Sequence, residues 1–258
     1  MEKIYNPDLH TKMQYLENAK QYTKDISQLS YELLEINKGQ KVLEFGCGGG
    51  YDVFNMSELV GSAGQLYGVD IDAETVQYAQ NKNQYDNVFF EQNVAKSLRF
   101  EENTFDRIRA ERVLQHVPNA EETIEDLLRV LKPNGKIGII ETDWESLCFF
   151  SPLPDIEQKI RKFITNVVSS NALVARKMSR NLFNNKTSVK QIVYSHLIDK
   201  YAIADAFIRL EHTLDVAQDK NYLNAQEREE WKKFTDEYNE KNIFIMQVNF
   251  IISVATKQ

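Results

Sequence analysis

A cluster of glycines directly after a short apolar segment constrains this chain more than any other feature. Residues 41–45 read KVLEF, and glycines follow at positions 46, 48, 49 and 50. Glycine permits positive φ in a tight turn, and its missing Cβ lets a ligand approach the backbone closely. A turn that is only structural needs one such residue rather than four. The stretch therefore predicts a strand, a ligand-binding turn and then a helix.

A second apolar segment ends in an acid about twenty residues past the last glycine, since residues 66–70 read LYGVD. A carboxylate at this distance suits two hydrogen bonds to a ribose diol. A dinucleotide-binding fingerprint would need its third glycine at position 51, where this chain has Tyr51. The spacing favours an adenosyl-type ligand. An NAD- or nucleotide-sugar-binding enzyme is the alternative.

Composition limits the other classes of protein. The 258 residues are 42% hydrophobic, which is enough for one large domain. The net charge of −7, with scattered Lys and Arg, argues against a nucleic-acid partner. No apolar signal segment and no stretch of ~20 apolar residues is present, so we expect a soluble, cytoplasmic protein. Cys47 and Cys148 lie far apart and only four histidines occur, so we expect reduced cysteines and no metal site.

Apolar periodicity alternates between strands and helices over the first 141 residues. We expect helical structure over 7–36, followed by strands separated by helices at about 51–60, 72–83 and 120–131. The expected strands are 41–45, 65–70, 87–92, 104–109 and 136–141, the last following a KPNG turn. This alternation predicts an α/β fold with a doubly wound, parallel sheet and helices on both faces.

The second half departs from simple alternation. Residues 156–175 and 202–240 have helical periodicity, whereas residues 189–200 alternate as a strand does. A β-branched apolar run within 243–257 predicts a final buried strand.

Three motifs carry a family resemblance. The stretch EFGCGGGY resembles motif I of the class I S-adenosylmethionine (SAM) dependent methyltransferases. AERVLQHVP at 110–118 and ETDW at 141–144 are similar to motifs of the small-molecule subgroup related to ubiquinone and menaquinone biosynthesis. The resemblance implies a Rossmann-like sheet of seven mostly parallel strands, with the last strand antiparallel and beside the fifth. It also implies one domain over 1–258, with a helical cap at 1–36, a SAM-binding core at 37–150, and substrate-side helices and final strands at 151–258. The N-terminal helix and a helical insertion would form a lid.

The same resemblance assigns residues to the cofactor, with S-adenosylhomocysteine (SAH) as its product. Glu44 would organise the methionine ammonium, Asp70 would hold the ribose hydroxyls, and Ile71 would pack against adenine. For Asp70 the alternative is capping the next helix, a role for which Asp72 is the better candidate. The other cofactor-binding residues implied are Gly46, Gly48, Gly50, Asn93, Val94, Ala110 and Glu111.

The acceptor is expected to be a small, apolar or aromatic molecule methylated at O, N or C. His116 is the candidate general base because its ordinary pKa is near neutral, with a structural helix position as the alternative. Tyr15, Arg112 and Trp144 are the candidate substrate contacts. For Tyr15 and Trp144 the alternative is packing in the core. A SAM-binding module without catalytic activity is a further alternative for the whole chain.

Overall fold

The computed structural model describes residues 8–93, 98–185 and 187–258. The described strands form a seven-stranded sheet in the order β3-β2-β1-β4-β5-β7-β6. The strands are β1 (Lys41–Phe45), β2 (Gln65–Asp70), β3 (Val88–Gln92), β4 (Phe105–Glu111), β5 (Leu131–Phe149), β6 (Thr187–Ile198) and β7 (Met246–Lys257). The helices are α1 (Leu9–Tyr22), α2 (Lys24–Leu34), α3 (Tyr51–Val60), α4 (Ala73–Lys82), α5 (Ala120–Val130), α6 (Pro154–Phe163), α7 (Val174–Asn184), α8 (Tyr201–Ile208), α9 (Leu210–Asp219) and α10 (Ala225–Glu240), with short helical turns η1 (Leu114–His116) and η2 (Ile164–Val168).

The strand directions confirm the predicted fold class. β1 pairs in parallel with β2 and β4, while β2 pairs in parallel with β3 and β4 with β5. β7 is antiparallel to both β5 and β6 and lies between them. The carboxyl ends of β1, β2 and β4 therefore meet at one edge of the sheet, where open α/β sheets bind ligands.

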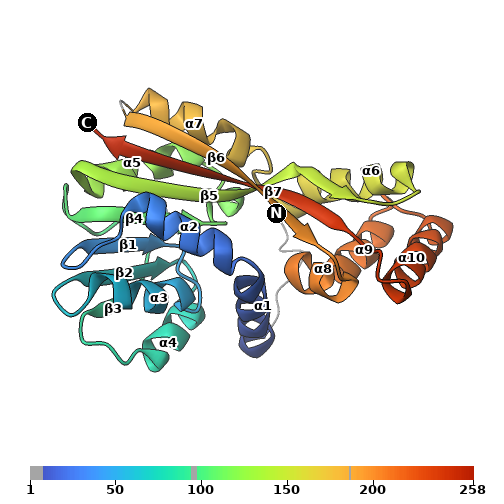
Figure 1. Cartoon of the computed structure of the whole chain (residues 1–258), viewed down its shortest axis with the longest axis horizontal. Helices are drawn as coiled ribbons and strands as arrows, with labels where there is room; N and C mark the ends of the chain where they lie inside the picture. Colours follow the sequence, from blue (N-terminus) through green and yellow to red (C-terminus); the bar gives the residue numbers. More distant parts are fainter. Residues whose placement is uncertain (1–7, 94–97, 186) are drawn as a thin grey trace.

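Helices cover both faces of the sheet (Figure 1). Along β1, Val42 belongs to the core shared with α2, α3 and α4, whereas Leu43 belongs to the core shared with α5 and α7. This alternation is what a strand buried on both faces requires. α1 stands apart from these layers and contacts α8 and α4.

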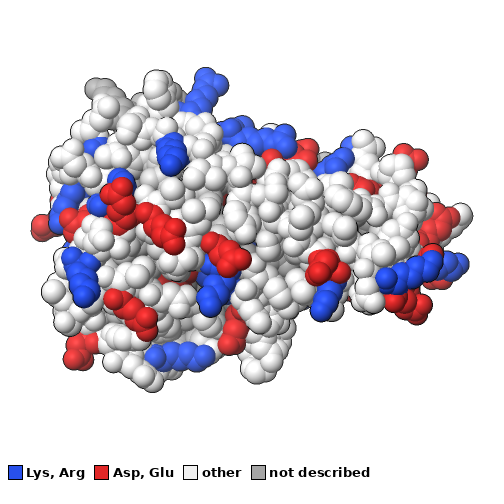
Figure 2. Space-filling model, in the orientation of Figure 1, with Lys and Arg blue, Asp and Glu red and all other residues white. Residues whose placement is uncertain are grey.

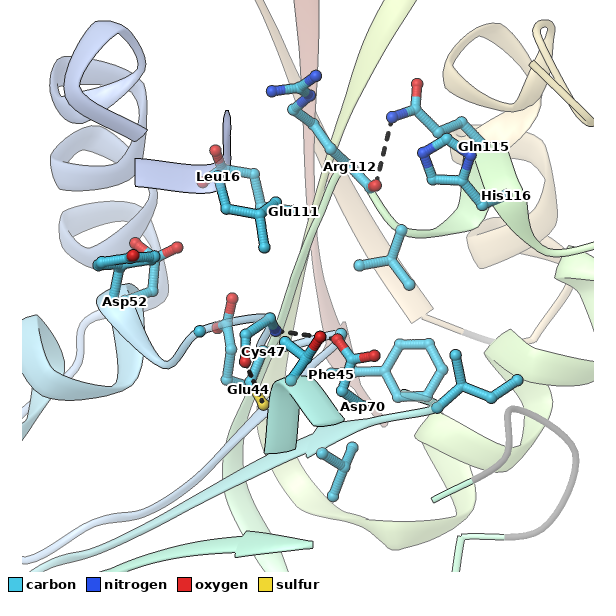
Figure 3. Close-up of a pocket in the computed structure, with 18 of the residues that line it drawn as sticks. Leu16, Glu44, Phe45, Cys47, Asp52, Asp70, Glu111, Arg112, Gln115 and His116 are labelled. Atoms are coloured by element: carbon cyan, nitrogen blue, oxygen red, sulfur yellow. Dashed lines mark hydrogen bonds between the residues drawn. The ribbon is translucent and has the colours of Figure 1, made fainter. Parts of the chain in front are cut away.

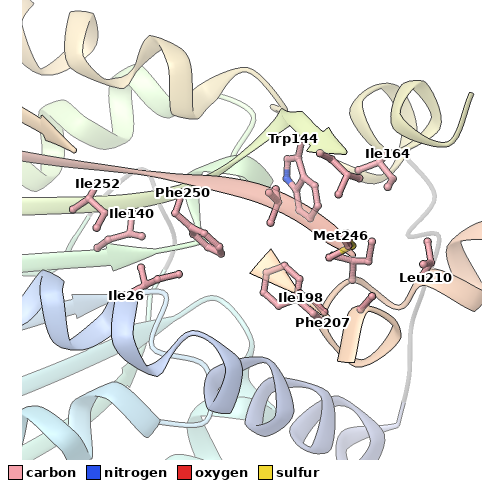
Figure 4. Packing of buried hydrophobic residues seen from close by; sticks show 14 of the residues in the cluster. Ile26, Ile140, Trp144, Ile164, Ile198, Phe207, Leu210, Met246, Phe250 and Ile252 are labelled. Carbon is pink, nitrogen blue, oxygen red and sulfur yellow. The ribbon is translucent and has the colours of Figure 1, made fainter. Parts of the chain in front are cut away.

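The helices α6, α8, α9 and α10 form a lobe at the far ends of β5, β6 and β7 (Figure 1). Their apolar side chains are continuous with the core under the sheet, as Figure 4 shows from Ile26 and Ile140 through Phe250 to Phe207 and Leu210. The lobe and the sheet thus share one hydrophobic core.

The predicted helix over 156–175 is wrong in its second half. The helical structure ends at Val168, and a new helix, α7, begins at Val174. Between them Ser169 Oγ and the Asn171 backbone N–H both donate to the carbonyl oxygen of Gln115. This tertiary contact replaces helical hydrogen bonds, and local periodicity does not report it.

The segments predicted as helical over 202–240 and 7–36 are also interrupted. Arg209, in the left-handed conformation with φ of 54°, separates α8 from α9, and a capping box at Asn224 starts α10. At the N-terminus, Thr23 separates α1 from α2. These breaks let α1 turn away from the sheet and contact α8.

The surface carries mixed charge. On the face shown in Figure 2, acidic and basic side chains are interspersed, and neither kind gathers into a patch. Among the described residues, no helix is both long enough and apolar enough to cross a lipid bilayer.

Candidate active site

A cavity of about 560 Å³ lies at the carboxyl ends of β1, β2 and β4, beside α1. Ten of the predicted site residues line it: Tyr15, Glu44, Gly46, Gly48, Asp70, Ile71, Asn93, Glu111, Arg112 and His116. Gly50, Ala110 and Trp144 do not line it, and Val94 lies outside the described residues. Figure 3 shows Glu44 and Asp70 in the lower part of the cavity, with Glu111 above them and Arg112 at the top.

The glycine turn approaches the cavity with its backbone. Gly46 and Gly48 have φ of 76° and 51°, and residues that carry a Cβ rarely adopt such positive values. A Cβ on Gly46 would lie 2.2 Å from a methyl carbon of Val113. Gly50, with φ of 84°, turns the chain into α3. Positive φ therefore favours glycine at all three positions, and at Gly46 the nearby Val113 side chain also leaves no room for a Cβ.

Asp70 ties the end of β2 to this turn. Its carboxylate accepts hydrogen bonds from the backbone N–H groups of Gly48 at 2.9 Å and Asp72 at 3.0 Å. Asp72, rather than Asp70, caps α4 through the N–H groups of Glu74 and Thr75, as the sequence predicted. A carboxylate has about four lone-pair positions, so Asp70 can still accept further hydrogen bonds from a ligand.

The two other predicted residues near Asp70 differ in exposure. Asn93 is buried, its backbone N–H donates to the Asp70 carbonyl oxygen, and its Nδ2 has no hydrogen-bond partner within the described chain. Ile71 is 64% exposed at the rim. An unpartnered buried amide and an exposed apolar side chain suit a ligand with both polar and apolar edges.

Charged side chains from four elements form a network under the cavity. Arg109, fully buried on β4, contacts Glu44 at 2.5 Å, Asp52 at 3.2 Å, and also Glu111. Lys20 at the end of α1 contacts Asp52 at 2.5 Å and Glu111 at 2.8 Å. Sequence reasoning missed Arg109 and Lys20. The available signal was a charged residue between two buried apolar positions, Ile108 and Ala110, of β4.

Among the described residues, the network has one more acidic side chain than it has cations. Burial raises the pKa of Glu44, although Arg109 acts in the opposite direction. Burial would also raise the pKa of Glu111, but Lys20 and Arg109 outweigh it and lower that pKa. Glu44 Oε2 is buried without a hydrogen-bond partner in the described residues. Three acidic side chains for two cations, and an oxygen of Glu44 without a partner in the described residues, favour a cationic group in the cavity, and a bound cation would in turn favour the charged form of Glu44.

The opposite end of the cavity carries Tyr15, Arg112 and His116. Arg112 follows β4 with φ of 57°, and its Nη2 donates to the Tyr15 hydroxyl at 3.2 Å. The His116 side chain is exposed at the cavity wall. Desolvation by the surrounding protein and the charge of Arg112 lower the pKa of His116 to about 4. Its imidazole is therefore neutral at pH 7.

Trp144 acts on the cavity through a neighbour. It is buried within β5, and its Nε1 donates to Oε1 of Gln115 at 2.6 Å. Gln115, which sequence reasoning missed, lines the cavity and also donates from Nε2 to the Arg112 carbonyl oxygen. Trp144 thus holds the segment between Arg112 and His116 in place.

Comparison with known proteins agrees with this geometry. A family model described as a methyltransferase domain matches residues 36–234. A demethylmenaquinone methyltransferase of Geobacillus sp. is 31% identical over 123 residues, covering 46% of this chain and 53% of that protein. An uncharacterized 37.1 kDa protein in transposon TN4556 of Streptomyces fradiae is 26% identical over 202 residues, covering 78% of this chain and 59% of that protein. The chain thus matches between half and three fifths of the length of these relatives.

Solved structures share the fold. A putative methyltransferase from Bacillus halodurans superposes with a TM-score of 0.64 at 14% sequence identity, covering 90% of this chain and 99% of that chain. At this identity the likeness shows a common fold alone.

Proposed function

Because this chain belongs to the methyltransferase domain family, we propose that it transfers a methyl group from SAM to an O, N or C nucleophile of a small, apolar or aromatic molecule. One observation carries the proposal. The glycine turn, Asp70 and the unpartnered oxygen of Glu44 line one end of a single cavity. These groups match the backbone, ribose and ammonium contacts that an adenosylated amino acid needs.

The residues fit the cofactor group by group. The excess carboxylate of the Glu44, Asp52 and Glu111 network would be neutralised by the methionine ammonium. Asp70 would accept from the ribose hydroxyls, Asn93 Nδ2 would donate to adenine, and Ile71 would pack against its face. Ala110 is buried beneath the cavity and would support this region through Glu111. The adenine contact of Val94 rests on the resemblance alone.

The protein's part in the chemistry is positioning. Bound SAM supplies a methyl group already activated by a sulfonium, so an aligned nucleophile in a site that excludes water provides most of the acceleration. α1 contributes Tyr15, Leu16 and Ala19 to the wall of the cavity and would help to exclude water around bound ligands. His116, neutral at pH 7, would accept a proton from an acceptor that carries one.

Calorimetric titration of variants with SAH tests the assignment of Asp70. Asp70→Ala should weaken SAH binding by about 1.5–3 kcal/mol, the contribution of charged hydrogen bonds. Asp72→Ala is the matched control, because it removes the neighbouring carboxylate that caps α4. It should lower the free energy of unfolding by about 1 kcal/mol with little change in SAH affinity. Unchanged SAH affinity in Asp70→Ala would remove the ribose role.

We also propose that the reaction takes place in the cytoplasm on a small-molecule acceptor. Both Cys47 and Cys148 are free thiols, which suits the reducing cytoplasm. The interspersed surface charge of Figure 2 suits a small-molecule acceptor better than a phosphate backbone.

A further inference from the structure

Arg112 is held rigidly at the end of the cavity opposite the ribose-binding residues. Its guanidinium lies over the Phe207 ring, 4.9 Å from the centroid, and its Nη2 donates to the Tyr15 hydroxyl. That hydroxyl donates in turn to the Phe207 carbonyl oxygen at 3.2 Å. The backbone of Arg112 is left-handed, with φ of 57°, a conformation that costs free energy in a residue with a Cβ and is concentrated at functional sites.

The charge of Arg112 has no counterion in the part of the chain that the structure describes. No carboxylate of these residues forms an ion pair with it, and its Nε is buried without a hydrogen-bond partner. Arg109, three residues earlier, contacts three carboxylates instead. Glu141 lies close enough to feel the charge of Arg112, but burial raises the pKa of Glu141 to about 8, so at pH 7 this group is largely protonated. A half-buried cation without a counterion in the described residues favours an anionic ligand.

The Arg112 side chain points away from the residues of the cofactor end. In Figure 3, Arg112 extends upward from the end of β4, while Asp70 and Glu44 lie at the bottom of the view with Glu111 between. Tyr15 of α1 contacts Arg112 and supplies an aromatic surface there, and Leu16 lines the same cavity. A second guanidinium, that of Arg209, lies 5.9 Å from the Tyr15 ring centroid.

We propose that the methyl acceptor carries a carboxylate, which pairs with Arg112 while the apolar body of the acceptor packs against α1. This inference rests on the proposed methyl transfer and adds the charge of the substrate to it. A guanidinium fixed on an aromatic ring and oriented by a hydroxyl is suited to bind a carboxylate with well-defined geometry.

The test uses pairs of probes that differ only in charge. Benzoate with benzamide, and phenylacetate with phenylacetamide, are titrated by calorimetry into the SAH-saturated protein. The wild type should bind each carboxylate at least about tenfold more tightly than its amide, as expected for a charge-assisted hydrogen bond. Arg112→Gln should lose this preference, and Arg112→Lys should retain part of it. Arg180→Gln removes the same charge from an exposed position on α7 and should behave as the wild type.

Three results would overturn the inference. The first is equal affinity for carboxylate and amide in the wild type, and the second is an unchanged preference in Arg112→Gln. The third is a tenfold or greater loss of SAH affinity in Arg112→Gln, because Arg112 would then serve the methionine carboxylate of the cofactor. Failure of the wild type to bind SAH would instead contradict the proposed methyl transfer, so the two failures are distinguishable.

Discussion

The two ends of the cavity are built in different ways. The cofactor end combines residues between 44 and 93 with Lys20 of α1 and with Arg109 and Glu111 of β4, and its buried charged side chains are paired, with one carboxylate in excess among the described residues. The acceptor end joins Tyr15 to Arg112, 97 positions away, and to Phe207, 192 positions away, and leaves Arg112 without an ion pair in the described chain. The comparison indicates that one end is organised for a cation and the other for an anion.

The largest expected effect comes from removing Arg109, which pairs with three carboxylates at the cofactor end. Arg109→Leu leaves three buried carboxylates with Lys20 alone, and we expect it to lower the free energy of unfolding by about 3–5 kcal/mol. Arg176→Leu is the control, because Arg176 pairs with Asp143 but its side chain is 49% exposed. That change should cost less than about 1 kcal/mol. If urea denaturation gave the same loss of unfolding free energy for Arg109→Leu and Arg176→Leu, the buried network would not stabilise the fold.

A change at His116 probes the acceptor end. With an accepted substrate, His116→Ala should lower kcat about a hundredfold, the low end for proton transfer, because the lowered pKa makes the imidazole a weak base. His10→Ala, at an exposed position on α1 outside the cavity lining, should leave kcat unchanged. The wild-type rate should not fall between pH 8 and pH 6, where His116 stays neutral. Equal kcat values for the two variants would exclude a catalytic role.

The excess carboxylate can be tested with a shortened ligand. Methylthioadenosine retains the adenosine of SAH but lacks the amino acid part. Glu44→Gln should weaken SAH binding by about 2 kcal/mol, since it removes a charged partner of the ammonium, and leave methylthioadenosine affinity unchanged. Asp70→Ala is the matched comparison and should weaken both ligands. If Glu44→Gln weakened both equally, the ammonium assignment would be wrong.

A pH dependence of the free energy of unfolding is also expected at the acceptor end. Burial raises the pKa of Glu141 to about 8, whereas an unfolded glutamate has a pKa of about 4.3. Between these values the folded protein holds a proton that the unfolded chain has lost, so this contribution to stability is present at low pH and disappears as pH rises through 8.

We therefore expect the free energy of unfolding to fall more steeply from pH 6 to pH 8 in the wild type than in Glu141→Gln, by up to about 1.4 kcal/mol per pH unit. The glutamine can still accept hydrogen bonds from the N–H groups of Val113 and Leu114, which makes it a conservative variant. Parallel pH profiles in urea denaturation would contradict the raised pKa.

The sequence predicted the cofactor end better than the acceptor end for a physical reason. The bounds of β1 and β2, the glycine turn and the cap at Asp72 depend on local conformation and short spacing. The pairing of Arg109 with Glu44 and Asp52 depends on which strands are adjacent, so spacing along the chain does not reveal it.

At the acceptor end, the decisive features are breaks in helices. The left-handed Arg209 and the contact of Ser169 and Asn171 with Gln115 set where α8 ends and α7 begins. Periodicity predicts a continuous helix across both places, because such contacts form only after distant segments have packed. Arg112 could be named as a candidate from its motif, but only the three-dimensional structure shows that it forms no ion pair with the described residues.

The most direct test of the cation-binding cofactor end is calorimetric titration of the wild-type protein with SAM, SAH and NAD at pH 7.5. We predict that SAM and SAH each bind with one site per chain and that NAD gives no binding heat. Absence of SAM and SAH binding, or tighter binding of NAD than of SAH, would contradict the proposed function.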